Sequence, residues 1–261
     1  MADVSNDEQK YRLRAGSFGQ ISRLYDEVRP DYPEELINDV ISISGIRPHD
    51  KILEIGIGTG KATRPFAERG FEITGIDISG EQISIAKRNL SGFSNISYLV
   101  SSFESAEIPL SYDLVISAQA FHFIKPGIGY EKVHRCLKDE GYLALFSNFP
   151  ARDELEQEVR RLFLKYCRGF PGGEYGTLRK LQERFKGSGF FMPVEKRTYS
   201  RNIEYSRDNY LGFIESMSWV STLSQESKSL LFRDLENLLK DAKNLRVPIE
   251  SILLIAKKKS G

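Results

Sequence analysis

The chain has 261 residues, of which 40% are hydrophobic, enough to bury one large core or one core with a small appended lobe. Its 37 basic and 36 acidic residues nearly cancel and leave a formal net charge of +1, so no overall field draws the protein toward nucleic acid or anionic lipid. The composition therefore favours a small molecule of neutral or mixed charge as its partner.

The cysteines and the N-terminal segment indicate the compartment. Cys136 and Cys167 are too few and too far apart for a disulfide framework or a thiolate metal site, which is typical of a reducing environment. Residues 1–14 are polar and charged, and no stretch approaches the roughly 18 apolar residues of a membrane span. We expect a cytoplasmic protein that does not enter membranes. No set of His, Cys and carboxylate residues has metal-ligand spacing, so no metal is predicted.

The first predicted elements surround a run of alternating glycines. An apolar strand at residues 51–55 leads into Gly56, Gly58 and Gly60, and a helix is predicted to follow as far as residue 69. A second strand at residues 71–76 ends at Asp77. A ligand is expected where the first strand ends, and the two oxygens of Asp77 suit the two hydroxyls of a ribose.

Three more apolar runs, at residues 96–100, 112–117 and 142–146, are predicted to be strands buried on both faces. Helical patterns lie between most of the strands; Ile83 and Ala86, for example, recur at helical spacing after the second strand. This alternation predicts right-handed crossovers and a parallel α/β sheet, with its topological switch point at the first strand.

The rhythm changes beyond Pro150, where longer helices are predicted. Their expected positions are residues 155–166, 177–186, 208–217 and a final helix after Ser224. Ser224 is predicted to cap that helix, whose apolar face would carry Leu231, Leu235, Leu238 and Ala242. Two further strands are predicted at residues 194–201 and 249–256.

Four segments together carry a resemblance to a known family: residues 54–60 (EIGIGTG), 75–79 (GIDIS), 112–117 (YDLVIS) and 120–123 (AFHF). In this order and spacing they resemble the class I S-adenosylmethionine-dependent methyltransferases that act on small molecules. The resemblance implies a Rossmann-like doubly wound sheet of seven mostly parallel strands in the order 3-2-1-4-5-7-6, with the last strand antiparallel.

The resemblance also implies one compound domain with three segments. Residues 1–45 would form a helical lead-in over the cofactor pocket, and residues 46–150 the S-adenosylmethionine-binding core. Residues 151–261 would complete the sheet and add helical insertions that cover the substrate.

By position, the resemblance assigns cofactor contacts to the ends of the first two strands. Gly56, Gly58 and Gly60 would leave room for the aminocarboxypropyl arm of S-adenosylmethionine. Glu54 would help to hold its ammonium group, directly or through water. Asp77 would accept hydrogen bonds from both ribose hydroxyls.

The adenine end has more than one candidate partner. Ile78 would lie against one face of the ring, and Ser102 and Phe103 stand where the family recognises the adenine edge. The family commonly has an acidic residue at the position of Ser102, so Ser102, Glu104 and the Phe103 backbone amide are alternatives, of which the amide is preferred. Gln119 after the fourth strand completes the predicted cofactor contacts.

The methyl acceptor would meet the cofactor beside the fourth strand. His122 is the candidate general base there, and Phe121 a candidate acceptor contact. Because His122 stands between two phenylalanines, the alternative is a packed, hydrogen-bonded residue that lines the pocket and has no catalytic role. In the lead-in, Tyr25 and Arg29 are candidates for substrate contacts; the alternative is that Arg29 pairs with a carboxylate and Tyr25 packs its helix.

The sequence therefore predicts methyl transfer from S-adenosylmethionine to a small-molecule acceptor by in-line displacement, with S-adenosylhomocysteine as product, in a monomer or homodimer. One alternative is a catalytically silent module that binds the cofactor. Another is a nicotinamide-dependent oxidoreductase, whose third glycine should fall where Lys61 stands. No nucleic-acid partner is expected, because residues 117–120 lack the proline-bearing motif of base recognition.

Overall fold

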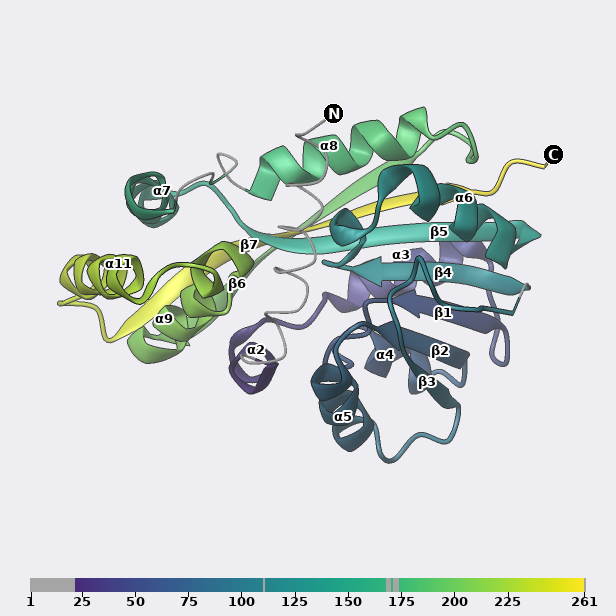
Figure 1. Cartoon of the computed structure of the whole chain (residues 1–261), viewed down its shortest axis with the longest axis horizontal. Coiled ribbons are helices and arrows are strands. Elements are labelled where there is room, and N and C mark those ends of the chain that lie inside the picture. The colour runs from purple at the N-terminus through teal and green to yellow at the C-terminus, as the bar shows by residue number, and fades with distance from the viewer. Residues whose placement is uncertain (1–21, 110, 168–169, 171–173, 261) are drawn as a thin grey trace. The chain divides into compact units, whose positions relative to one another are not determined.

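A computed structural model describes residues 22–109, 111–167, 170 and 174–260. The strands of these residues form a seven-stranded sheet in the order β3-β2-β1-β4-β5-β7-β6 (Figure 1). The strands are β1 (Lys51–Ile55), β2 (Glu72–Asp77), β3 (Ile96–Val100), β4 (Tyr112–Ala118), β5 (Leu137–Pro150), β6 (Glu195–Ser206) and β7 (Asn244–Lys257). No helix within the described residues has both the length and the apolar character needed to cross a membrane.

The helices in the described ranges are α2 (Ser22–Val28), α3 (Glu34–Ser44), α4 (Thr63–Ala67), α5 (Gly80–Asn89), η1 (Phe121–Phe123), α6 (Pro126–Cys136), α7 (Glu154–Tyr166), α8 (Glu174–Gly187), α9 (Arg207–Glu215), α10 (Ser218–Ser221) and α11 (Gln225–Leu238). Four strand pairs are parallel: β1 with β2, β1 with β4, β2 with β3 and β4 with β5. The last strand is antiparallel, so the predicted strand order and directions are confirmed.

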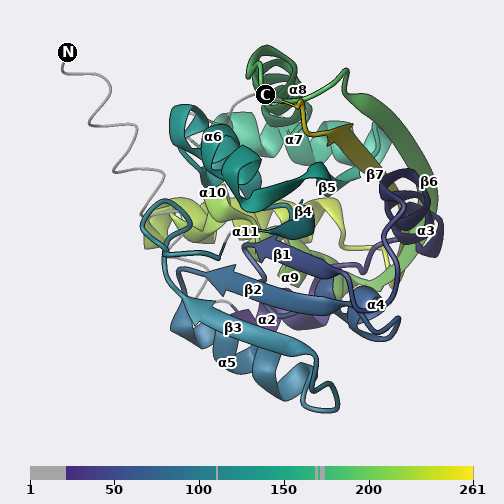
Figure 2. The same cartoon turned by 90° about the vertical axis from the view of Figure 1, so that its right-hand side faces the viewer.

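The strand order reverses between β1 and β4, where β1 pairs with β2 on one side and with β4 on the other. Figure 2 shows β3, β2 and β1 side by side, with α5 running beside them. In open parallel sheets, ligands bind beyond the carboxyl ends of the strands at such a reversal. The fold therefore directs attention to the segments that follow β1, β2 and β4.

The chain divides into two compact units. Among the described residues, the sheet unit consists of those within Asp31–Asn148, Arg179–Tyr199 and Ser251–Gly261, and the helical unit of those within Met1–Pro30, Phe149–Leu178 and Ser200–Glu250. The expected segments 1–45, 46–150 and 151–261 of one compound domain stay a prediction. Residues 1–21 of the lead-in lie outside the described residues.

In the sheet unit, alternate strand residues build the main core. Ile52 of β1 and Leu114 and Ile116 of β4 share one face of the sheet, because side chains alternate along a strand. They form a buried cluster with Leu36 of α3 and Phe66 of α4. The prediction that β3 is buried on both faces was wrong: β3 is one of the two edge strands, and none of its residues is fully buried.

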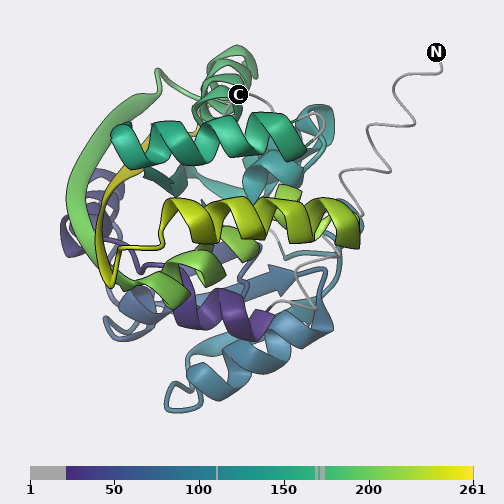
Figure 3. The same ribbon diagram turned by 90° about the vertical axis from the view of Figure 1, so that its left-hand side faces the viewer.

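In the helical unit, α7 and α11 lie side by side (Figure 3). Lys165 and Tyr166 of α7 both donate hydrogen bonds to the Asp234 carboxylate of α11, at 3.0 and 2.5 Å. Ser224 caps α11 as predicted, because its hydroxyl accepts the Ser227 N–H at 3.2 Å.

The predicted apolar face of α11 is correct for only half of its members. Leu231 and Leu235 are fully buried, but Leu238 is exposed, and α11 ends before Ala242. Leu239 is buried instead. Leu239 lies four positions after Leu235, so it continues the buried stripe at helical spacing.

Several elements differ in extent from the sequence prediction: β5, β6 and β7 are longer than the predicted 142–146, 194–201 and 249–256. β5 begins at Leu137, because the exposed residues 138–140 extend the strand without adding to an apolar run. α3 lies within the predicted helical lead-in of residues 1–45, but its bounds were not predicted, although Glu34 and Glu35 occupy its first turn and Gly45 follows it at φ 68°. Acidic residues in the first turn and a glycine in the left-handed region after the last turn are typical of the two ends of a helix.

Candidate functional site

The glycine turn after β1 is fixed by backbone hydrogen bonds to the end of β2. The N–H groups of Gly56 and Ile57 both donate to the Ile76 carbonyl, at 2.8 and 3.0 Å. Gly56 has φ 75°, in the left-handed region, and a Cβ there would lie 2.3 Å from the Cβ of Ala120. The turn thus needs glycine for its own packing against the segment after β4, besides the expected room for a ligand.

We expect Gly56→Ala to destabilise the protein by about 2–4 kcal/mol, since it combines backbone strain with overpacking. The melting temperature and urea midpoint would measure this loss. Gly92→Ala is the matched control, because nothing lies within 4 Å of a Cβ at Gly92. Equal stability of the two variants would contradict the tight contact between Gly56 and Ala120.

Asp77 at the end of β2 joins the glycine turn to the start of α5. Its Oδ2 accepts the Gly58 N–H and its Oδ1 accepts the Ser79 N–H, both at 2.9 Å. Burial raises the pKa of Asp77, while these N–H groups lower it in part. Each carboxylate oxygen has a second lone pair, so Asp77 can accept hydrogen bonds from a diol while it holds the turn.

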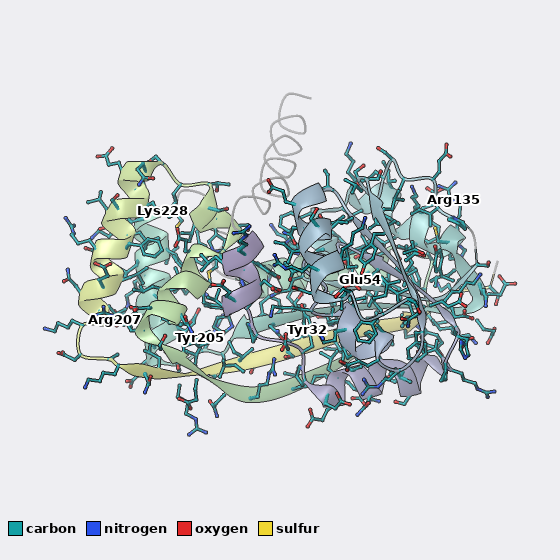
Figure 4. The ribbon with its side chains drawn as sticks, turned by 90° about the horizontal axis from the view of Figure 1, so that it is seen from below. Tyr32, Glu54, Arg135, Tyr205, Arg207 and Lys228 are labelled. Carbon is teal, nitrogen blue, oxygen red and sulfur yellow. The ribbon has the colours of Figure 1, made fainter. Side chains whose placement is uncertain are left out.

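Glu54 on β1 is a fully buried carboxyl group with one oxygen unsatisfied. Oε2 accepts the Thr63 hydroxyl at 2.6 Å, and no described residue donates to Oε1. Burial, with the nearby charge of Asp77, raises the pKa of Glu54 to about 8. Figure 4 shows Glu54 in the interior of the sheet unit.

A buried carboxyl oxygen without a donor is costly, and an ammonium group beside it would offset that cost. The hydroxyl of Thr59, in the same glycine turn, is also buried and has no partner among the described residues. Sequence reasoning missed Thr59 and Thr63. Only the fold shows that α4 brings Thr63 to Glu54.

At the expected adenine end, Ile78 lies 46% exposed at the tip of β2, a large apolar side chain available to a flat ring. Ser102 is occupied locally: its hydroxyl accepts the Ser105 N–H at 3.3 Å and donates to the Ser105 hydroxyl at 3.0 Å. The carboxylate of Glu104 accepts the Lys125 N–H at 3.2 Å. The Ser102 hydroxyl and the Glu104 carboxylate thus already have hydrogen-bond partners, whereas the Phe103 N–H has none among the described residues.

The segment after β4 carries the acceptor-side candidates. Gln119 has φ 54°, unusual for a residue with a side chain, and its Nε2 donates to the Asn148 carbonyl at 2.7 Å. His122 is half-buried in η1, with its ring centroid 4.0 Å from that of Phe123. Phe121 is buried, with its ring 5.0 Å from Tyr130. The packing of Phe121 therefore has a structural explanation, and its role in acceptor binding stays a prediction.

Tyr25 and Arg29 belong to the helical unit. The Arg29 guanidinium lies 5.3 Å from the ring centre of Tyr25 and 4.8 Å from that of Phe213, and its Nε donates to the Ser216 hydroxyl at 2.8 Å. In the same unit, the Tyr205 hydroxyl, labelled in Figure 4, donates to the Val28 carbonyl at 3.1 Å. These contacts show how Arg29 joins α2 to α9, and its substrate role stays a prediction.

The described residues contain no group of three or more His, Cys, Asp or Glu side chains that could hold a metal ion. The arrangement beyond β1 and β2 instead offers a buried acid, a carboxylate at a strand tip and an exposed apolar side chain, contributed by Glu54, Asp77 and Ile78. Such a set can receive a ligand with an ammonium group, a diol and a flat ring.

The chain is similar to known methyltransferases. A family model described as a methyltransferase domain matches residues 53–145. An uncharacterized methyltransferase of Schizosaccharomyces pombe is 30% identical over 223 residues, which cover 83% of this chain and 84% of that protein. An uncharacterized methyltransferase of Mycobacterium tuberculosis is 34% identical over 149 residues, 56% of this chain and 57% of that protein.

Among solved structures, a phosphoethanolamine N-methyltransferase of Haemonchus contortus has the same fold. It superposes with a TM-score of 0.54 at 17% sequence identity, covering 92% of this chain and 57% of that one. That structure is a complex with phosphomonomethylethanolamine and S-adenosylhomocysteine.

Proposed function

Since this chain belongs to the class I S-adenosylmethionine-dependent methyltransferase family, we propose that it binds the cofactor beyond β1 and β2 and transfers its methyl group to a small-molecule acceptor. The observation that carries the proposal is Glu54, a fully buried carboxyl whose Oε1 has no donor among the described residues. The complex of the Haemonchus contortus relative with S-adenosylhomocysteine supports the choice of cofactor.

We propose the following contacts, which the positions of the side chains support. Glu54 holds the ammonium group, Asp77 accepts hydrogen bonds from the ribose diol, and Ile78 covers one adenine face. Gly56, Gly58 and Gly60 give the aminocarboxypropyl arm access to backbone. Gln119, at the end of β4, completes the cofactor side.

When bound, the cofactor supplies an electrophilic methyl group on a sulfonium sulfur. The protein has to hold the acceptor atom in line, about 3 Å from that methyl, and to exclude water. His122, on the segment after β4, is the proposed base that accepts the acceptor's proton, and Phe121, Tyr25 and Arg29 are the proposed acceptor contacts. A small acceptor is supported by the net charge of +1, which offers no field for a polyanion.

The cytoplasm is the proposed location, supported by the cysteine content: Cys136 and Cys167 are both free and buried. A monomer or homodimer is the proposed assembly.

Methyl transfer can be tested by incubating the protein with methyl-labelled S-adenosylmethionine and an extract of small metabolites. We expect label in a low-molecular-weight product. Label only in protein or nucleic acid would contradict the proposed acceptor class, and no transfer to any acceptor would favour a silent binding module.

In the same assay, His122→Ala is expected to lower kcat about a hundredfold while cofactor affinity is kept, because it removes a proton acceptor. His134→Ala is the matched control, since His134 lies on α6 and contacts the Lys259 carbonyl at 3.0 Å, away from the segment after β4. Full activity of His122→Ala would contradict the role of His122 as a base and indicate that it only packs in the pocket.

A further inference from the structure

Lys132 of α6 holds the turn that follows β3. Its ammonium group donates hydrogen bonds to the carbonyls of Glu104 and Ala106, at 3.2 and 2.5 Å, and lies 5.2 Å from the ring centre of Phe103. One lysine thus contacts three of the residues 103–106. Burial lowers the pKa of Lys132, which is consistent with an ammonium group drawn out of water by these contacts.

A second contact ties the same turn to the start of α6. The Glu104 Oε1 accepts the N–H of Lys125, the residue that precedes α6. Such an N–H at a helix start has no partner within the helix, so the Glu104 carboxylate caps α6. The turn is therefore attached to α6 at Lys125 and, two helical turns later, at Lys132.

These attachments leave backbone N–H groups of the turn available, those of Ser102, Phe103 and Glu104. The side chains of Ser102 and Glu104 are engaged with Ser105 and Lys125, whereas no described residue accepts a hydrogen bond from the Phe103 amide. The Phe103 side chain is buried beneath Lys132, so its backbone cannot turn freely. Lys132 thus fixes the direction of an unsatisfied N–H donor.

We propose that Lys132 is a positioning residue for adenine, which fixes the turn after β3 so that the Phe103 amide donates to the ring nitrogen N1. This inference rests on the proposed cofactor site. N1 of adenine is a hydrogen-bond acceptor. N1 of hypoxanthine carries a hydrogen, so two N–H donors would point at each other and no hydrogen bond could form. A protein with a rigid turn therefore binds the adenine ligand more tightly than the hypoxanthine ligand. If the turn is mobile, the Phe103 N–H can move away from the hypoxanthine N–H, and this difference in affinity becomes smaller.

The test compares two ligands by calorimetry, S-adenosylhomocysteine and its hypoxanthine analogue S-inosylhomocysteine. The wild-type protein is expected to prefer the adenine ligand about thirtyfold, the effect of one unmatched buried hydrogen bond. Lys132→Met should reduce this preference to about threefold or less. Lys132→Arg should restore most of it, because a guanidinium can also donate to two carbonyls.

Lys87→Met is the matched control. Lys87 also lies over an aromatic ring, 5.6 Å from the centre of Tyr98, but it is an exposed residue of α5, and Tyr98 belongs to β3 and not to the turn. This variant should keep the wild-type preference. If Lys132→Met does not fold, Lys132→Gln replaces it, with the same reduction expected because its shorter side chain cannot reach both carbonyls.

Weaker binding of both ligands to Lys132→Met with an unchanged preference would overturn the positioning role and leave Lys132 as a structural residue. Absence of binding by the wild-type protein would overturn the proposed cofactor site itself. The two failures are therefore distinguishable.

Discussion

Asp77→Ala is expected to weaken S-adenosylhomocysteine binding about a thousandfold, the largest effect of any single substitution in the proposed site. Two charge-assisted hydrogen bonds to the ribose would be lost, each typically about 1.5–3 kcal/mol. The same change frees the Gly58 and Ser79 N–H groups that Asp77 now holds, so the glycine turn would also lose its support. Isothermal titration calorimetry measures this loss directly.

The control for Asp77 is Asp113→Ala. Asp113 likewise accepts a backbone hydrogen bond, from the Lys51 N–H at 2.9 Å, and pairs with Lys138 at 2.7 Å, but Lys51 is the first residue of β1, at the opposite end from the glycine turn. We expect Asp113→Ala to lower stability and keep ligand affinity. Equal losses of affinity in the two variants would indicate a general effect of stability, contrary to the ribose assignment.

The second large effect concerns Glu54 and pH. Because the pKa of Glu54 is raised to about 8, the ligand-free protein holds this carboxyl protonated at neutral pH. An ammonium group beside it favours the carboxylate, so binding should release a proton below about pH 8. We expect S-adenosylhomocysteine affinity to rise between about pH 6 and pH 8, by up to about tenfold per pH unit.

Glu54→Gln should lower affinity about a hundredfold at pH 8, because the ammonium would be buried without its counter-charge. It should also remove the pH dependence of binding and the proton release, which calorimetry in buffers of different ionisation enthalpy detects. Glu72→Gln, an exposed glutamate on the neighbouring strand β2, is the control. A pH profile that is equally steep in Glu54→Gln would contradict this account.

The raised pKa of Glu54 also makes the free energy of unfolding depend on pH. Below the ordinary glutamate pKa of 4.5 both the folded and the unfolded chain hold the Glu54 proton, and between 4.5 and about 8 only the folded chain does. The contribution of Glu54 to the free energy of unfolding therefore falls as pH rises through this window and levels off above it. Glu54→Gln should lack this decline in denaturant titrations of the ligand-free protein.

Local sequence patterns predicted the elements that position the site. The apolar runs of β1 and β2, the glycine turn and Asp77 lie within one continuous stretch, so their arrangement depends on short-range chain geometry and the standard crossover. The strand order was available only through the resemblance. Apolar periodicity could not reveal that β3 is an edge strand, because burial depends on what lies beside a strand.

Side-chain partnerships between distant segments could not be predicted. The position of Glu104 predicted a possible contact with adenine. In the structure its carboxylate accepts the N–H of Lys125, 21 residues further along the chain, and caps α6. Arg29 suited either a pocket or a carboxylate, and it donates to Ser216, 187 residues away. Such pairs depend on tertiary geometry, which no local pattern encodes.

A crystal structure of the protein with S-adenosylhomocysteine would test the central claim most directly. The account predicts that both ribose hydroxyls donate to the Asp77 carboxylate, while the ammonium group lies on the Glu54 side chain. A nucleoside bound elsewhere, with Asp77 and Glu54 keeping only their present partners, would contradict it.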